Sequence, residues 1–162
     1  MEILLISTIL IPMLVGVFHL FGKVNNRNTL SLVALVLNMI IIVGCCFLSG
    51  SFTFIQISSD LNISFMLDGL GKYFAVLVAF MWLVVGYYSF EYMEHEEDHH
   101  HFYGFYFLTL GAFNAICFSA NYMTLYCFFE FMTLLSMPLV LHSKKLEAIQ
   151  AAKKYLMYSV FG

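Results

Sequence analysis

Long apolar runs dominate this sequence, and one of them, residues 123–142, carries a single acidic side chain, Glu130. A helix that begins near Asn121 rises about 1.5 Å per residue, which places Glu130 roughly 13 Å along a hydrocarbon core about 30 Å thick. A charged side chain at that depth costs about 2.5 to 3.5 kcal/mol, so intramembrane carboxylates usually face a bundle interior or an ion path. The sequence therefore predicts a membrane protein with one candidate ion-path residue.

The composition agrees with a membrane protein. Of the 162 residues, 62% are hydrophobic and 10% are charged, whereas soluble domains are about 45 to 50% apolar. The formal net charge is −3 and no basic stripe is present, which excludes nucleic acid as a partner because nothing would neutralise its phosphates. We expect a multi-pass protein surrounded by the lipid bilayer of the cell's inner (plasma) membrane.

Six apolar segments predict an all-α, polytopic bundle of transmembrane helices. The expected ranges are 3–21, 29–48, 70–88, 102–118, 122–141 and an incomplete 148–162. Pro12 and Pro138 lie inside two of them, where a proline is tolerated if a neighbouring group satisfies the freed carbonyl. The last segment has about fifteen residues where a crossing needs about twenty. We therefore expect either a truncated longer protein or a natural half that another chain continues.

A β-hairpin is expected on the membrane surface between the second and third helices. Apolar residues alternate on both sides of Ser58, Ser59 and Asp60, which predicts two short strands. Asp68 follows the second strand and opens the third helix. Two roles fit Asp68, either a cap on an orphan backbone N–H or a direct part in an ion path.

The fifth helix offers possible partners for Glu130. One face of the predicted helix carries four polar residues at helical spacing, namely Tyr122, Tyr126, Glu130 and Thr133. The carboxylate of Glu130 therefore has the polar side chains of Tyr126 and Thr133 as neighbours. The alternative is a protonated Glu130 that hydrogen-bonds a neighbouring helix and stabilises packing.

Two lysines in the last segment are candidates for an intramembrane base. Lys154 lies on a polar face of the predicted helix, whereas Lys153 is offset by about 100°. The alternative is that both lysines anchor the helix end at the membrane interface.

The His- and Glu-rich loop 91–101 has no ligand pair at a known metal spacing. We interpret it as a solvated turn, with a proton-collecting patch or a docking contact as alternatives. The cysteines, Cys45, Cys46, Cys117 and Cys127, lie within apolar runs and read as small buried residues. We expect no metal and no cofactor in this chain.

Loop cations predict the orientation. If the loop with Lys23 and Arg27 faces the cytoplasm, the loop with Lys144 and Lys145 does too, and the hairpin and the Ser119 turn lie outside. The N-terminus is therefore expected outside.

Residues 68–162 resemble the N-terminal part of the antiporter-like subunits. These are shared by respiratory NADH:quinone oxidoreductase, membrane-bound nickel–iron hydrogenases, formate hydrogenlyases and multisubunit cation/proton antiporters. The resemblance rests on LDGLGKYF, SANYMTLYCFFEFMTLLSMPLVLH and EAIQAAKKYL, in the family's order and separation. It implies helices 1 to 6 of a fourteen-helix fold. It also implies that Glu130 and Lys154 match the family's fifth-helix glutamate and sixth-helix lysine, and that Asp68 matches the aspartate opening the third helix. The family's later lysines and its second repeat have no counterpart here.

The resemblance implies a proton-translocating subunit of an energy-converting redox complex, in which Glu130 and Lys154 form an ion pair that is made and broken. No redox residues are visible, so any coupled electron transfer belongs to partner membrane subunits. Alternatives are a subunit of a multisubunit Na⁺/H⁺ antiporter and a non-pumping structural membrane subunit.

Overall fold

The computed structural model describes residues 1–22, 26–56, 61–93, 99–141 and 146–161. Within these ranges the chain forms helices and one two-stranded sheet. In chain order the elements are α1 (Glu2–Phe21), α2 (Arg27–Cys46), β1 (Gly50–Gln56), β2 (Asn62–Leu67), α3 (Gly69–Tyr92), α4 (His99–Cys117), α5 (Tyr122–Val140) and α6 (Leu146–Phe161). The predicted helical fold with a hairpin before the third helix is confirmed. Lys23, the turn at Ser58–Asp60, the centre of the His-rich loop, and Lys144 and Lys145 lie outside the described residues.

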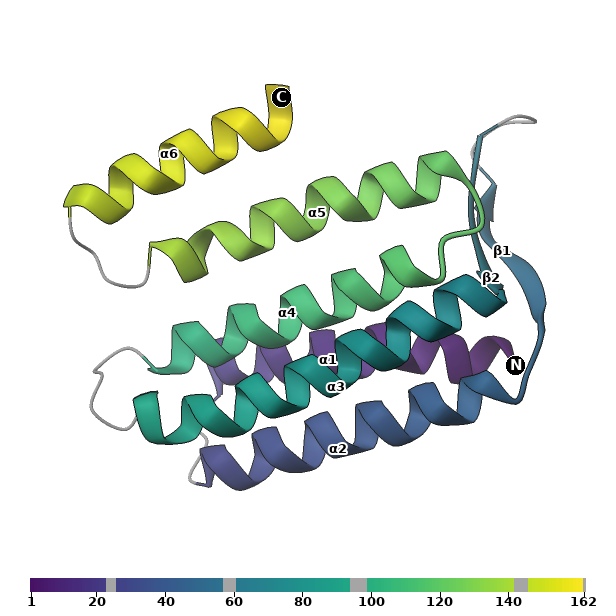
Figure 1. The fold of residues 1–162 in the computed structure, drawn as a ribbon, viewed down its shortest axis with the longest axis horizontal. Helices are drawn as coiled ribbons and strands as arrows, with labels where there is room; N and C mark the ends of the chain where they lie inside the picture. The colour runs from purple at the N-terminus through teal and green to yellow at the C-terminus, as the bar shows by residue number, and fades with distance from the viewer. Residues whose placement is uncertain (23–25, 57–60, 94–98, 142–145, 162) are drawn as a thin grey trace.

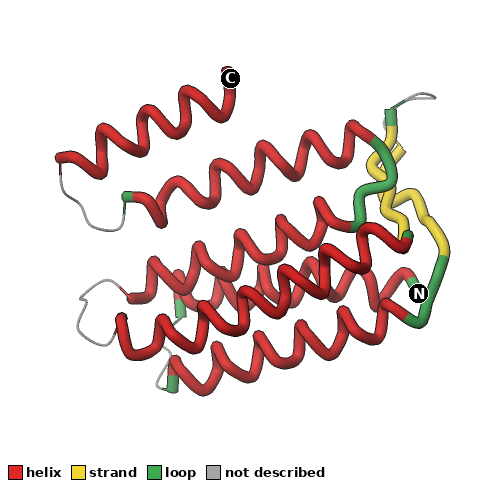
Figure 2. The backbone as a smooth tube through the Cα atoms, in the orientation of Figure 1, coloured by secondary structure: helices red, strands yellow, loops and turns green. Residues whose placement is uncertain are grey.

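The helices run side by side with alternating direction, and the hairpin closes one end of the bundle beside the N-terminus (Figures 1 and 2). α4 lies in the middle and contacts α1, α3 and α5. α6 contacts α5 on the side away from α4 (Figure 1). The turn between α4 and α5 lies at the hairpin end, as the predicted topology requires.

Four helices, α1, α2, α3 and α5, are long and apolar enough to cross a membrane. Among the described residues α4 falls outside this group, because its nineteen residues begin with three histidines. α6 has sixteen residues, which span about 24 Å of a core about 30 Å thick. The chain is therefore a multi-pass membrane protein whose central helix is flanked by better membrane-crossing helices.

Glycines bring α1 and α4 into close contact. A Cβ atom on Gly16 would lie 2.7 Å from the carbonyl oxygen of Gly104, and one on Gly111 would lie 2.7 Å from the carbonyl oxygen of Ile9. Small residues let helix backbones approach in membranes, where packing and hydrogen bonds replace the hydrophobic driving force. The α1–α4 interface therefore depends on the absence of side chains at these positions.

This close approach lets a side chain of α4 repair the proline break in α1. Pro12 has no N–H to donate to the carbonyl of Thr8, its partner one turn earlier. The Nδ2 of Asn114 donates to that carbonyl at 2.8 Å and to the Oδ1 of Asn38 on α2 at 3.2 Å. A neighbouring helix thus satisfies the carbonyl that Pro12 leaves free, which is the condition under which a membrane helix tolerates a proline.

The hairpin is bonded to the rest of the bundle along one strand edge. β1 pairs with β2 in antiparallel register, with an irregularity between Thr53 and Ile55. On its other edge β2 meets the turn after α4, where the Met66 N–H donates to the Phe118 carbonyl at 2.8 Å and the Ala120 N–H donates to the Ser64 carbonyl at 2.9 Å. Both edges of β2 are thus hydrogen-bonded.

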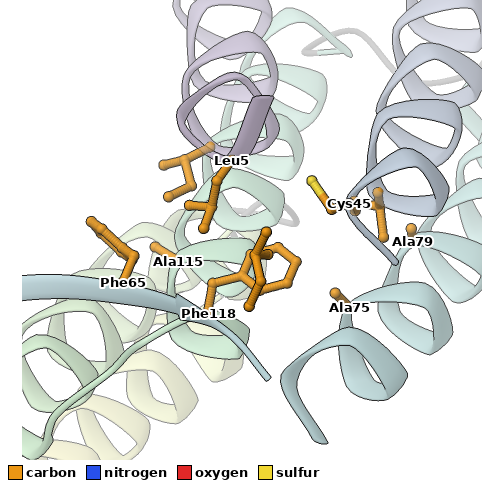
Figure 3. Packing of buried hydrophobic residues seen from close by; sticks show 10 residues of the cluster. Leu5, Cys45, Phe65, Ala75, Ala79, Ala115 and Phe118 are labelled. Atoms are coloured by element: carbon orange, nitrogen blue, oxygen red, sulfur yellow. The ribbon is translucent and has the colours of Figure 1, made fainter. Parts of the chain in front are cut away.

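A buried cluster lies beneath the hairpin, where five segments meet. Figure 3 shows side chains of α1, α2, β2 and α3 gathered around the end of α4. The members that it labels are Leu5, Cys45, Phe65, Ala75, Ala79, Ala115 and Phe118. Because Phe65 is only 3% exposed, the hairpin is part of the core rather than a loose appendage.

Candidate functional site

Glu130 lies in the middle of α5, at the ninth of its nineteen residues. Its side chain is half-buried. The hydroxyl of Thr133, which is only 2% exposed, donates to the backbone carbonyl of Glu130 at 2.8 Å. Thr133 therefore bonds to the helix backbone at Glu130. Because this bond uses the backbone carbonyl, it leaves the Glu130 carboxylate available for another partner.

The polar stripe of α5 is uncovered over its first half. Tyr122 is 90% exposed and Tyr126 is 60% exposed, whereas Thr133 is buried. α5 contacts both α4 and α6, yet both tyrosines are largely uncovered. The predicted face exists as a helical stripe, but within the described residues only its Thr133 end is enclosed.

α6 brings both candidate lysines to the neighbourhood of α5. Lys153 and Lys154 are exposed, while Ala152 beside them is 1% exposed. The two helices are joined by a hydrogen bond of 2.9 Å between the hydroxyls of Ser136 and Tyr155. No ion pair within 4.0 Å joins Glu130 to either lysine in the described ranges.

Asp68 acts as the N-cap of α3. Its Oδ1 accepts a hydrogen bond from the Gly71 N–H at 2.8 Å, which satisfies one of the four donors that a helix start leaves free. Asp68 also lines a cavity of about 320 Å³ with Phe74, Phe113 and Ser119. The structure thus supplies the capping bond and places Asp68 at the hairpin end of the bundle, whereas Glu130 lies at mid-helix.

His19 and Asn38 are among the buried polar residues that were not singled out from the sequence. His19 on α1 is fully buried, with its Nε2 3.1 Å from the Ser31 hydroxyl and its ring parallel to Phe107 at 5.8 Å. Asn38 on α2 is 1% exposed and bonded to Asn114. Each is a single polar residue within an apolar run, the same signal that had marked Glu130. Among the described residues, no group of histidines, cysteines and carboxylates is placed to hold a metal.

Comparison with known proteins gives a family match and named relatives. A family model described as "NADH-Ubiquinone oxidoreductase (complex I), chain 5 N-terminus" matches residues 54–103, from β1 into α4. The chain is also 33% identical over 103 residues to "Na(+)/H(+) antiporter subunit A1" from Staphylococcus aureus strains JH9 and Newman. The chain is therefore similar to antiporter-like membrane subunits over part of its length.

The coverage of these matches is partial. The aligned stretch is 63% of this chain and 13% of each Staphylococcus relative. The family match includes Asp68 and ends before Glu130 and Lys154. The family match therefore rests on the hairpin, α3 and the start of α4, and it says nothing about Glu130 or Lys154.

Proposed function

We propose that this antiporter-like chain takes part in proton translocation within a multisubunit membrane complex, and that Glu130 and Lys154 load and release the proton. The observation that carries the proposal is the position of Glu130, which is half-buried at the centre of a helix apolar enough to cross a membrane. Intramembrane carboxylates of this kind usually mark ion or proton paths.

The arrangement of α5 and α6 supports a paired role. The two helices lie side by side (Figure 1), joined by the Ser136–Tyr155 bond. A lysine that approaches a carboxylate to 4 Å gains about 4 kcal/mol at an effective dielectric constant near 20. That energy corresponds to about a thousandfold change in proton affinity. Making and breaking a Glu130–Lys154 pair is therefore sufficient to move a proton.

Other groups take supporting roles in this proposal. Lys153 is an alternative partner of Glu130, Tyr126 and Thr133 shape the polar stripe, and Asp68 lies where ions enter or leave at the hairpin end. In this proposal the N-terminus and the hairpin lie on the outer, non-cytoplasmic side of the membrane. Electron transfer, if the complex couples to it, takes place in partner subunits of a complex like NADH:quinone oxidoreductase or a membrane-bound hydrogenase.

The test uses the assembled complex in proteoliposomes, with proton movement followed by a pH-sensitive dye. We expect Glu130→Gln to slow proton movement at least tenfold, which corresponds to about 1.4 kcal/mol. Glu91→Gln is the matched control, because Glu91 is an exposed glutamate near the end of α3. Subunit content is checked by native mass spectrometry. Wild-type rates in a fully assembled Glu130→Gln complex would refute the proposal and favour a structural subunit, in which removing a buried charge is neutral or stabilising.

The name of the Staphylococcus relatives favours a second candidate, exchange of Na⁺ for H⁺. The same vesicles distinguish the two. Proton movement that requires Na⁺ on the opposite side of the membrane supports exchange, whereas proton movement driven by redox turnover without Na⁺ supports a redox-coupled pump.

A further inference from the structure

Two neighbouring amide side chains in the bundle interior have atoms that no protein group satisfies. In the described part of the chain, Asn38 Nδ2 and Asn114 Oδ1 are buried without a hydrogen-bond partner. Asn38 is 1% exposed and Asn114 is 0% exposed. An unsatisfied buried polar group costs about 1 to 3 kcal/mol, and hydrocarbon around the bundle offers no replacement partner.

No rotation of the two amides removes the problem. The Thr8 carbonyl can only accept a hydrogen bond, so Asn114 must point its Nδ2 toward α1 and turn its Oδ1 away. The same Nδ2 reaches Asn38, which must therefore present its Oδ1 and turn its own Nδ2 away. Rotating Asn114 would set two oxygens against each other, and rotating Asn38 would set two donors against each other. One acceptor and one donor group thus remain on adjacent side chains.

We propose that Asn38 and Asn114 hold a bound water molecule, which donates to Asn114 Oδ1 and accepts from Asn38 Nδ2. Water matches this pair because it is both donor and acceptor, and buried waters usually have two to four polar partners. Leu35 and Ile42, the buried residues about one turn before and after Asn38 on α2, offer no polar group. The near-complete burial of both amides leaves no entry for a larger ligand.

The proposed water site is separate from the Glu130 region. Its helices are α1, α2 and α4, whereas Glu130 lies on α5. A second buried polar pair on these helices, His19 with Ser31, is seven residues from Asn38 along α2, which is about 10 Å. Ala34 and Leu35 are buried between them. The water would therefore satisfy the two side chains, Asn38 and Asn114, that lie beside the proline break in α1. The inference does not depend on the proposed proton path.

The first test is a cryo-electron microscopy map of the assembled complex at a resolution that shows ordered waters. We expect density for one water within about 2.7 to 3.2 Å of both Asn38 Nδ2 and Asn114 Oδ1. A map that shows these two atoms bonded to protein groups, or shows no density between them, would overturn the proposal.

The second test detects water by magnetisation transfer in solid-state NMR of the lipid-reconstituted complex. Labelled Asn38–Met39 and Asn114–Ala115 pairs identify both asparagines without substitution, because each dipeptide occurs once in the sequence. We expect transfer from water to the Asn38 side-chain amide but none to the backbone amides of Leu35 and Ile42. Transfer to all of them would indicate opening of the bundle, and transfer to none would indicate a dry interface; either result contradicts the proposal.

Discussion

Asn114 donates a hydrogen bond of 2.8 Å to the carbonyl of Thr8, the group that Pro12 leaves without its helical donor. The two residues lie 106 positions apart in the chain. The bond joins α1 to the central helix α4 at the point where α1 lacks one of its own backbone hydrogen bonds. A backbone defect in one helix thus becomes a specific contact with another.

Replacing Asn114 tests this repair. We expect Asn114→Ala to lower the free energy of unfolding by about 1 to 3 kcal/mol, because the Thr8 carbonyl is left buried and unbonded. Pro12→Ala restores an N–H donor for that carbonyl, so the cost of Asn114→Ala should shrink in a Pro12→Ala background. Thermal unfolding in detergent, followed by the fluorescence of Trp82, measures both costs. Equal costs in the two backgrounds would show that Asn114 does not act through the proline break.

Gly111 tests the contact between α1 and α4. A Cβ at Gly111 would meet the Ile9 carbonyl at 2.7 Å, so we expect Gly111→Ala to destabilise the chain by about 1 to 3 kcal/mol. Gly44→Ala is the control, since a Cβ there meets only Leu4 at 3.6 Å. Its gain in helix propensity, up to about 1 kcal/mol, should make Gly44→Ala neutral or stabilising. If both substitutions had the same effect on the unfolding temperature, close packing at Gly111 would not be the cause.

Asp68 allows capping to be separated from ion transport. Asp68→Asn keeps an oxygen that accepts from the Gly71 N–H, whereas Asp68→Ala removes it. We expect Asp68→Ala to cost about 1 kcal/mol and Asp68→Asn to have near wild-type stability. The rate of proton movement in the Asp68→Asn complex then reports the effect of removing the negative charge while the capping bond is kept. A stable Asp68→Asn complex with slow proton movement would assign Asp68 to the ion path, and normal movement would leave it as a cap.

Asn121 connects α5 to the hairpin through both ends of its amide. Its Oδ1 accepts from the Thr124 N–H at 2.8 Å, and its Nδ2 donates to the Asn62 carbonyl at 3.0 Å. The same Nδ2 also donates to the Asn62 Oδ1 and the Ser64 hydroxyl. We expect Asn121→Ala to cost about 2 kcal/mol, because it removes both the cap and the bonds to the hairpin. Asn121→Asp keeps the acceptor and loses the donors, so its cost should come from the hairpin alone and should be smaller than the cost of Asn121→Ala. An Asn121→Asp variant that loses as much stability as Asn121→Ala would disprove this division.

The helices and the hairpin could be predicted from the sequence because their signals are local. Apolar runs gave the helices, alternation gave the strands, and Pro12 indicated that some neighbouring group must satisfy a carbonyl. The identity of that neighbour could not be predicted, because it depends on which helices meet in space. The same reason explains why Asn38 and His19 were missed, although each interrupts an apolar run. The polar face around Glu130 was predicted from spacing, but spacing alone does not show that only the Thr133 end of this face is enclosed, because enclosure depends on where α4 and α6 pack against α5.

The central claim, that Glu130 and Lys154 act as one unit in moving protons, is tested most directly by a double-mutant cycle. Initial rates of proton movement are measured for assembled complexes carrying Glu130→Gln, Lys154→Gln and both, with Lys72→Gln on α3 as the control for a lysine outside α5 and α6. Residues that act as a unit are non-additive. We predict that the double variant loses no more activity than the more impaired single variant. Losses that multiply, or a Lys154→Gln complex as active as the wild type, would contradict the account.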